Sequence, residues 1–164
     1  MQFVVRPVSD GDRPRIRELI RKRWGDECVV VHGVSYIPHT LRGYVAENEG
    51  NEQIGLATFI LENAACELVT LDSLEEGRGV GTALVNAVAA EAGGSKCTRL
   101  WCVTTNDNLH AIRFYQKRGF RIVAVHSGAV ERARQMKPLI PLMGIDGIAI
   151  RDEIELEMKL EFHR

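Results

Sequence analysis

The stretch "EEGRGVGTALV", Glu75–Val85, decides the fold, because it places three glycines on alternate positions directly before a run of good helix formers. The preceding "CELVTL" (66–71) mixes β-branched and apolar residues, which predicts a strand. Apolar residues recur at helical spacing after the loop, which predicts an amphipathic helix that runs to about Glu91 and is ended by Gly93-Gly94. The predicted order is therefore strand, glycine loop, helix.

This glycine loop is a candidate phosphate site. Unpaired backbone N–H groups at the start of a helix, together with a helix dipole of roughly half a positive charge, suit a phosphate or pyrophosphate. A tight turn with close helix–strand packing explains the glycines equally well. Two familiar phosphate loops do not fit: Gly81-Thr82 lacks the Lys of a P-loop, and Leu84 stands where a dinucleotide-binding fingerprint needs a third Gly.

Length and charge favour a single cytoplasmic domain. The chain has 164 residues, enough for one domain (1–164) to bury about two-thirds of its unfolded surface. Its formal net charge of −1, from 21 basic and 22 acidic side chains, provides no general basic field for nucleic acid. No apolar run approaches the roughly 20 residues of a membrane span, and the N-terminus lacks the apolar core of a signal peptide. Neither nucleic acid nor a membrane is therefore an expected partner.

The cysteines and histidines are scattered along the chain. Without a C-x-x-C pair, four residues are expected to be reduced small hydrophobes: Cys28, Cys66, Cys97 and Cys102. The histidines form no i, i+4 pair that could present two ligands on one helix face; they stand at positions 32, 39, 110, 126 and 163. No metal site is expected.

The remaining pattern predicts a mixed α/β chain with an antiparallel front half and crossover helices behind it. Further strands are expected at 3–8, at 42–47 and 53–61 as a hairpin, and at 98–105, 120–126 and 154–162. Further helices are expected from Asp12 to Gly25 and at 109–119. No period is clear between residues 26 and 40. Residues 127–153 form a long insertion before the last strand, which is either a functional lid or a surface excursion.

Two motifs resemble the GNAT superfamily of acetyl-CoA-dependent N-acetyltransferases. "EGRGVG" (Glu76–Gly81) is similar to the family's Gln/Arg-x-x-Gly-x-Gly/Ala pyrophosphate loop, with Glu76 where the family usually has Gln or Arg. "NLHAIRFYQKRGF" (Asn108–Phe120) is similar to its Asn-x-x-Ala-x-x-Phe-Tyr-x-x-x-Gly-Phe segment. The resemblance implies the GNAT fold: an α/β (α+β) architecture with a mixed, mostly antiparallel central sheet, flanking helices and two strands that splay apart to admit the pantetheine arm.

The same resemblance implies acetyl-CoA as co-substrate and names its contacts. The backbone at the end of the strand before the loop would pair with the pantetheine amides: Leu71, Asp72 and Ser73. The loop itself would hold the pyrophosphate, chiefly through backbone N–H groups, with the side chain of Glu76 turned outward: Glu76, Gly77, Arg78, Gly79, Val80, Gly81 and Thr82. Asn108 would contact the cofactor arm, and asparagine is also a good helix N-cap, so both roles remain open.

Acetyl transfer to an amine needs a proton acceptor and a proton donor. By resemblance, Tyr115 contacts the cofactor and is the general acid for the departing thiolate; the alternative is a core tyrosine with a satisfied hydroxyl. A count back from the loop without gaps places Ala65 where many relatives carry a glutamate, and Glu67 lies two residues further on the same strand face. Glu67 is therefore the candidate to receive the amine proton, directly or through water. The alternatives are a solvent-facing Glu67 and Asp72 as the base.

Acceptor specificity is expected to come from residues 24–39 and 127–153. Trp24, His32 and Tyr36 either line a pocket or serve in packing. In the insertion, the polar part Glu131–Lys137 is expected to face the cleft or solvent, while a set of apolar residues anchors the segment: Leu139, Ile140, Leu142, Met143, Ile145, Ile148 and Ile150. A dimer contact is the alternative, so a homodimer remains open.

The predicted function is an N-acetyltransferase that transfers an acetyl group from acetyl-CoA to a primary amine, with a small molecule favoured over a protein. No cysteine is placed for a ping-pong route, so direct transfer in a ternary complex is expected. The alternative function is a non-catalytic acyl-CoA-binding or sensing module.

Overall fold

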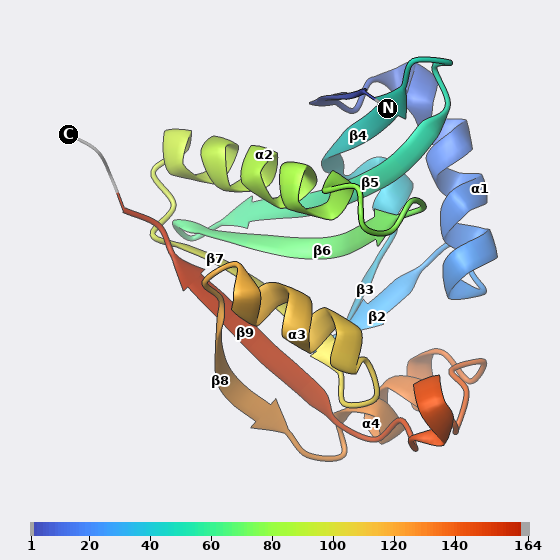
Figure 1. Ribbon diagram of the computed structural model, residues 1–164. Helices are drawn as coiled ribbons and strands as arrows, with labels where there is room; N and C mark the ends of the chain where they lie inside the picture. The colour runs from blue at the N-terminus through green and yellow to red at the C-terminus, as the bar shows by residue number, and fades with distance from the viewer. Residues whose placement is uncertain (1, 162–164) are drawn as a thin grey trace.

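The computed structural model describes residues 2–161 and contains a seven-stranded sheet of order β1-β4-β5-β6-β7-β9-β8 beside a separate β2–β3 hairpin (Figure 1). The strands are β1 (Phe3–Pro7), β2 (Val29–Val31), β3 (Val34–Tyr36), β4 (Arg42–Asn48), β5 (Gln53–Glu62), β6 (Ala65–Ser73), β7 (Arg99–Thr105), β8 (Arg121–His126) and β9 (Glu153–Lys159). The helices are α1 (Arg13–Trp24), α2 (Val80–Gly94), α3 (Leu109–Lys117) and α4 (Ala129–Met136), with single 3-10 turns at Asp10–Asp12, Pro38–Thr40 and Ile145–Gly147.

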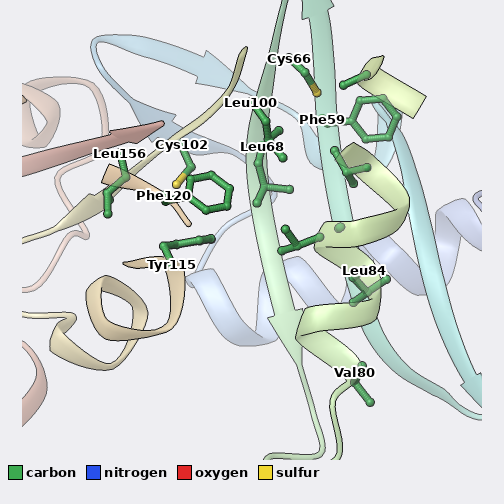
Figure 2. Close-up of a cluster of buried hydrophobic side chains, with 14 of the residues drawn as sticks. Phe59, Cys66, Leu68, Val80, Leu84, Leu100, Cys102, Tyr115, Phe120 and Leu156 are labelled. Carbon is green, nitrogen blue, oxygen red and sulfur yellow. The ribbon is translucent and has the colours of Figure 1, made fainter. Parts of the chain in front are cut away.

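This architecture confirms the predicted fold. Every strand pair in the large sheet is antiparallel except β6–β7, and helices cover both faces. In Figure 1, α2 lies across the half of the sheet that contains β4, β5 and β6, α3 lies across the half that contains β7 and β9, and α1 is on the other side from α2. Two buried clusters follow from this arrangement. One joins α2 and α3 to the sheet (Figure 2), and the other joins α1 to the opposite face.

The splay between β6 and β7 is the feature that positions the site. β6 pairs with β7 only at Ala65↔Arg99, Cys66↔Leu100 and Glu67↔Trp101, whereas its pairing with β5 continues to Ser73. The register between β5 and β6 shifts beside Thr58, which leaves Val69 as an extra residue in β6. Such a bulge bends a strand and increases its twist. β6 therefore turns away from β7 immediately after Glu67, and the predicted splay is confirmed.

The largest differences from the predicted boundaries are at the ends of α2 and β9. α2 continues through Gly93 and Gly94, the pair that was predicted to end it. The left-handed position that follows the helix is occupied by Lys96, at φ 61°, after Ser95. The backbone N–H of Cys97 then reaches the Ala92 carbonyl at 2.9 Å, a Schellman-type ending that does not require glycine at the last helical positions. In the last predicted strand, β9 begins at Glu153 and ends at Lys159, while Phe162 and His163 lie outside the described residues.

The β2–β3 hairpin was not predicted, although a signal for it exists. Val31 pairs with Val34 across the two-residue turn His32-Gly33, whose φ angles are 41° and 79°. Two positive φ values in succession are the requirement of a tight hairpin turn, and Gly33 supplies one of them at no steric cost. The strands are only three residues long, too short for alternation to be recognised.

Within the described part of the chain, no helix combines the length and the apolar character that crossing a membrane would need.

Candidate active site

The glycine loop leads directly into α2. Gly77 and Gly79 adopt φ angles of 73° and 78°, a backbone conformation that favours glycine, and a Cβ added to either would meet nothing within 4 Å. The first helical hydrogen bond of α2 runs from the Ala83 N–H to the Gly79 carbonyl at 3.0 Å. The first-turn N–H groups therefore have no earlier carbonyl of the helix to bind, and the space over the two glycines is open. This cradle fits a phosphate group.

Gly81 has a different role from its neighbours. A Cβ at this position would lie 3.2 Å from the Phe114 ring, so this glycine lets α2 and α3 approach each other closely. Glu76 is exposed to solvent, and the acidic neighbour Glu75 pairs with Arg78 at 3.2 Å.

Asn108 caps α3. Its side-chain Oδ1 accepts a hydrogen bond from Ala111 N at 3.1 Å, which satisfies one of the unpaired donors in the first helical turn. Of the two roles considered for Asn108, the structure contains the cap; the contact with a cofactor arm remains a proposal.

Tyr115 extends from α3 into the core beside Phe120 and Cys102 (Figure 2). The residue is 8% exposed, and its ring centre lies 5.1 Å from that of Phe120. Its hydroxyl interacts with the Cys102 thiol, and burial raises the pKa of the phenol well above its usual value. Tyr115 is thus a packed tyrosine, as one alternative had it, and it is also a phenol that keeps its proton at neutral pH.

Glu67 lies at the last paired position before β6 and β7 diverge. The residue is 7% exposed, and each carboxylate oxygen has a partner: Oε1 lies 2.6 Å from His32 Nε2, and Oε2 accepts from the Tyr36 hydroxyl at 2.9 Å. The alternative of a solvent-facing carboxylate is therefore wrong. The physical reason is the β2–β3 hairpin, which brings both partners over this face of β6.

His32 is held from three sides. Its backbone N donates to Glu153 Oε2 at 3.0 Å, and its ring centre lies 5.1 Å from that of Trp101. The hydrogen bond with Glu67 raises the pKa of the imidazole, and desolvation opposes this increase. The pKa of Tyr36 is also raised, first by burial and then by Glu67. Of the three residues considered for an acceptor pocket, His32 and Tyr36 thus meet at Glu67.

A cleft of about 360 Å³ lies beside this cluster. It is lined by Ile60, Glu62, Asn63, Ala65, Glu67, Arg99 and Trp101. Arg99 lies over the Trp101 ring at 4.9 Å and pairs with Glu157 at 3.2 Å and Glu155 at 3.5 Å. The cleft therefore contains the buried carboxylate of Glu67 and the aromatic ring of Trp101. The one cation beside them in the lining, Arg99, is paired with two glutamates.

Asp72 and Trp24 lie elsewhere, at the end of α1. Asp72 is buried; its Oδ1 accepts from Arg23 Nε at 2.9 Å, and its Oδ2 lies 3.4 Å from Trp24 Nε1. Burial raises the pKa of Asp72, and the charge of Arg23 opposes this increase. Both oxygens thus attach β6 to α1. Unlike Glu67, Asp72 does not line the cleft, which makes it a weaker candidate for the base.

Arg134 and Lys137 anchor the insertion 127–153, contrary to the prediction for them, whereas Glu131, Arg132 and Gln135 are exposed as predicted. α4 contacts β2, and its Ala129, Val130 and Ala133 are buried. Lys137 is also buried, with Nζ donating to the carbonyls of Trp24 and Cys28 at 2.9 Å each. Four residues expected to anchor the segment are instead exposed: Leu139, Leu142, Met143 and Ile145. The reason is Arg134, which binds the carbonyls of the loop and holds it without apolar burial: those of Ile140, Pro141 and Ile150.

Cys66, Cys97 and Cys102 are buried, and Cys28 is half-buried; all four are free thiols. Burial raises the pKa of Cys66 and of Cys102 to about 12. Among residues 2–161, no group of three or more His, Cys, Asp or Glu side chains is arranged to hold a metal ion.

Comparison with known proteins places this site in a family. The sequence profile described as the acetyltransferase (GNAT) family matches residues 13–120. The chain belongs to the GNAT acetyltransferase family. In this GNAT member, the matched part contains the β2–β3 hairpin, Glu67, the glycine-loop motif and the α3 motif. It ends before the insertion.

Individual proteins are also similar to this chain over most of its length. The chain is 39% identical over 152 residues to YdhI of Bacillus subtilis (strain 168), an uncharacterized protein, with 93% of this chain and 95% of that protein covered. An IAA acetyltransferase from Bacillus cereus superposes with a TM-score of 0.73 at 21% identity, covering 97% of this chain and 100% of that one. A GNAT family acetyltransferase from Elizabethkingia anophelis with acetyl-CoA bound superposes with a TM-score of 0.69 at 21% identity, covering 96% and 98%. The two solved structures share the fold.

Proposed function

We propose that this chain transfers an acetyl group from acetyl-CoA to the primary amine of a small molecule, with both substrates bound at the same time. The observation that carries the proposal is Glu67, a buried carboxylate beside an open cleft at the point where β6 leaves β7. A buried carboxylate next to a cleft is a candidate for proton transfer.

The glycine loop and the open edge of β6 are the parts that would hold acetyl-CoA. Backbone N–H groups of Gly77–Thr82 would bind the pyrophosphate, and the backbone of Leu71–Ser73 would bind the pantetheine amides as an added strand does. The fit rests on the empty space over Gly77 and Gly79 and on the divergence of β6 from β7. When bound, acetyl-CoA supplies an activated acetyl group.

Two side chains then handle the protons. Glu67 receives the proton of the attacking amine, directly or through water. Tyr115 donates a proton toward the departing thiolate; its phenol is protonated at neutral pH, although burial raises its pKa and so makes it a weaker acid than an exposed tyrosine. Catalysis through an acetylated cysteine is not favoured, because burial keeps the Cys66 and Cys102 thiols protonated, with pKa values of about 12.

A small acceptor suits the dimensions of the cleft. Its volume of about 360 Å³ is at the lower end of the usual range for small-molecule sites. The acceptor's amine would approach Glu67 past Trp101, which also lines the cleft.

The test combines binding and turnover. Calorimetry should show acetyl-CoA binding to the wild-type protein, and a panel of primary amines should include at least one that causes release of free thiol. Glu67→Gln should reduce the turnover by on the order of 10²-fold or more, with acetyl-CoA affinity unchanged. As a matched control, Glu52→Gln changes an exposed carboxylate at the β4–β5 turn and should have no effect on turnover. Full activity of Glu67→Gln would remove Glu67 from the mechanism.

The alternative is a non-catalytic acyl-CoA-binding module, and the packing of the Tyr115 hydroxyl against Cys102 is the observation that favours it. Such a module would bind acetyl-CoA with the same cradle and release no thiol with any amine. The same two measurements therefore separate the two functions.

A further inference from the structure

Glu67 does not lie alone in the site. Its Oε1 is 2.6 Å from His32 Nε2, a short contact that requires a proton between the two atoms. Its other oxygen is held by the Tyr36 hydroxyl, which can only fix the carboxylate in place because its own pKa is raised. Of the two partners, only the imidazole can exchange a proton near neutral pH.

We propose that Glu67 and His32 form one proton-accepting pair, in which His32 takes over the proton that Glu67 removes from the amine. This inference rests on the proposed function and names a positioning residue for it. His32 acts through Glu67 and not on the substrate itself.

The transfer balances as follows. In the competent pair, Glu67 is a carboxylate and His32 is a neutral imidazole that carries its proton on Nδ1, so Nε2 can accept one. The N–H bond of the amine breaks as an O–H bond forms on Glu67. That O–H bond then breaks as an N–H bond forms on His32 Nε2. The imidazolium then gives the Nε2 proton to water, which restores the competent pair. In the protonated pair, one proton already lies between Nε2 and Oε1, so this form cannot accept another.

The surroundings of His32 determine where the pair titrates. β6 contributes Glu67, β3 contributes Tyr36 and β9 contributes Glu153, while β7 contributes the uncharged Trp101, with Arg99 over its indole ring. The hydrogen bond and the charge of Glu67 and the charge of Glu153 favour the imidazolium, and burial disfavours it. The net effect raises the pKa of His32, so activity should increase with pH through a midpoint above the usual histidine value of about 6.5.

The first experiment measures this midpoint without turnover. NMR titration of histidine-labelled protein should show the His32 imidazole with a midpoint above about 6.5, and Glu67→Gln should lower that midpoint. His126→Gln provides the matched control and assigns one further signal, because His126 contacts a different glutamate, Glu155, at 3.3 Å. An identical His32 midpoint in the wild-type and Glu67→Gln proteins would overturn the inference.

The second experiment is the pH dependence of kcat/KM. The acid limb of the wild-type profile should coincide with the NMR midpoint, and it should remain there in His126→Gln. His32→Gln should lower kcat/KM by on the order of tenfold and remove this limb, whereas thermal melts should show that the variant is folded. A limb that is unchanged in His32→Gln would contradict the pair. Failure of the proposed function looks different, since the wild-type protein would then release no thiol at any pH.

Discussion

Arg118 joins the two motifs that identify the family. Its Nε donates to Thr82 Oγ1 at 2.8 Å, which connects the end of α3 to the first turn of α2. Its guanidinium carbon also lies 3.6 Å from the centre of the Phe114 ring, the ring on which Gly81 packs. The start of α2 is thus supported by α3 independently of the glycine loop. Changes within the loop should therefore remain local.

The first prediction concerns Gly79. Because this residue has a φ of 78°, Gly79→Val should strain the loop, lower the free energy of unfolding by about 1–2 kcal/mol and misplace the backbone N–H groups. Calorimetry should then show acetyl-CoA binding weakened by about tenfold or more. Gly93→Ala is the control: it lies in α2 with open space around it and should bind acetyl-CoA normally. Normal binding by Gly79→Val would remove the loop from the cofactor site.

The second prediction concerns the Tyr115 hydroxyl. Tyr115→Phe keeps the ring packed against Phe120 and should leave acetyl-CoA affinity nearly unchanged, while turnover decreases by on the order of 10²-fold. Tyr44→Phe is the matched control, because it removes a tyrosine hydroxyl that binds Glu91 at 2.6 Å. Steady-state kinetics of the two variants give the answer, and a wild-type rate in Tyr115→Phe would show that its hydroxyl serves only in packing.

The third prediction separates Asp72 from Glu67. Because both Asp72 oxygens bind α1, Asp72→Asn should keep turnover within about tenfold of the wild-type value, far above that of Glu67→Gln. Asp72→Asn should instead change how the stability of the protein depends on pH. Burial raises the folded-state pKa of Asp72, so the folded protein holds this proton more tightly than the unfolded chain does.

This group therefore makes the protein lose stability as the pH rises from the ordinary aspartate pKa of about 3.9 through the raised value. Urea titrations across that range should show the decrease in the wild-type protein and a smaller one in Asp72→Asn. A loss of turnover as large as that of Glu67→Gln would instead make Asp72 part of the proton pathway.

The fourth prediction concerns Lys137. Lys137→Met keeps the apolar stem but removes the ammonium that binds the Trp24 and Cys28 carbonyls, which should cost about 1.5–3 kcal/mol of stability. Since α4 packs on β2, which leads into His32, the KM for the amine should rise several-fold while acetyl-CoA affinity stays constant. The exposed Lys159→Met is the control. An unchanged KM in Lys137→Met, in a protein with the expected loss of stability, would exclude a role of the insertion in acceptor binding.

Local sequence was enough to predict most elements of the large sheet and its helices. β4 and β5 alternate or run apolar over seven and ten residues, and the glycine loop and the Asn108 cap mark the starts of α2 and α3. The boundaries that differed depend on interactions that leave little trace in the local sequence. α2, for example, ends at Gly94 because Lys96 adopts the αL position that was expected of a glycine.

The candidate site divides in the same way. Glu67 could be chosen from strand periodicity, but nothing local indicated that it is buried, because its partners lie 35 and 31 positions away on the hairpin. The insertion shows the same limitation. Its isoleucines and leucines suggested burial, whereas the loop is held by Arg134 and Lys137 through main-chain carbonyls that no sequence pattern identifies.

By itself, the sequence determined the order of strands and helices, the glycine loop and the family, because these depend on residues that are near neighbours along the chain and act through backbone conformation and periodic burial. Only the tertiary structure decided how Glu67 is used. Its environment is assembled from β3, β6, β9 and the His32-Gly33 turn, and the pKa of His32 follows from distances between these segments. Electrostatic interactions depend on separation in space and on burial, and neither quantity is encoded in the spacing of residues along one strand.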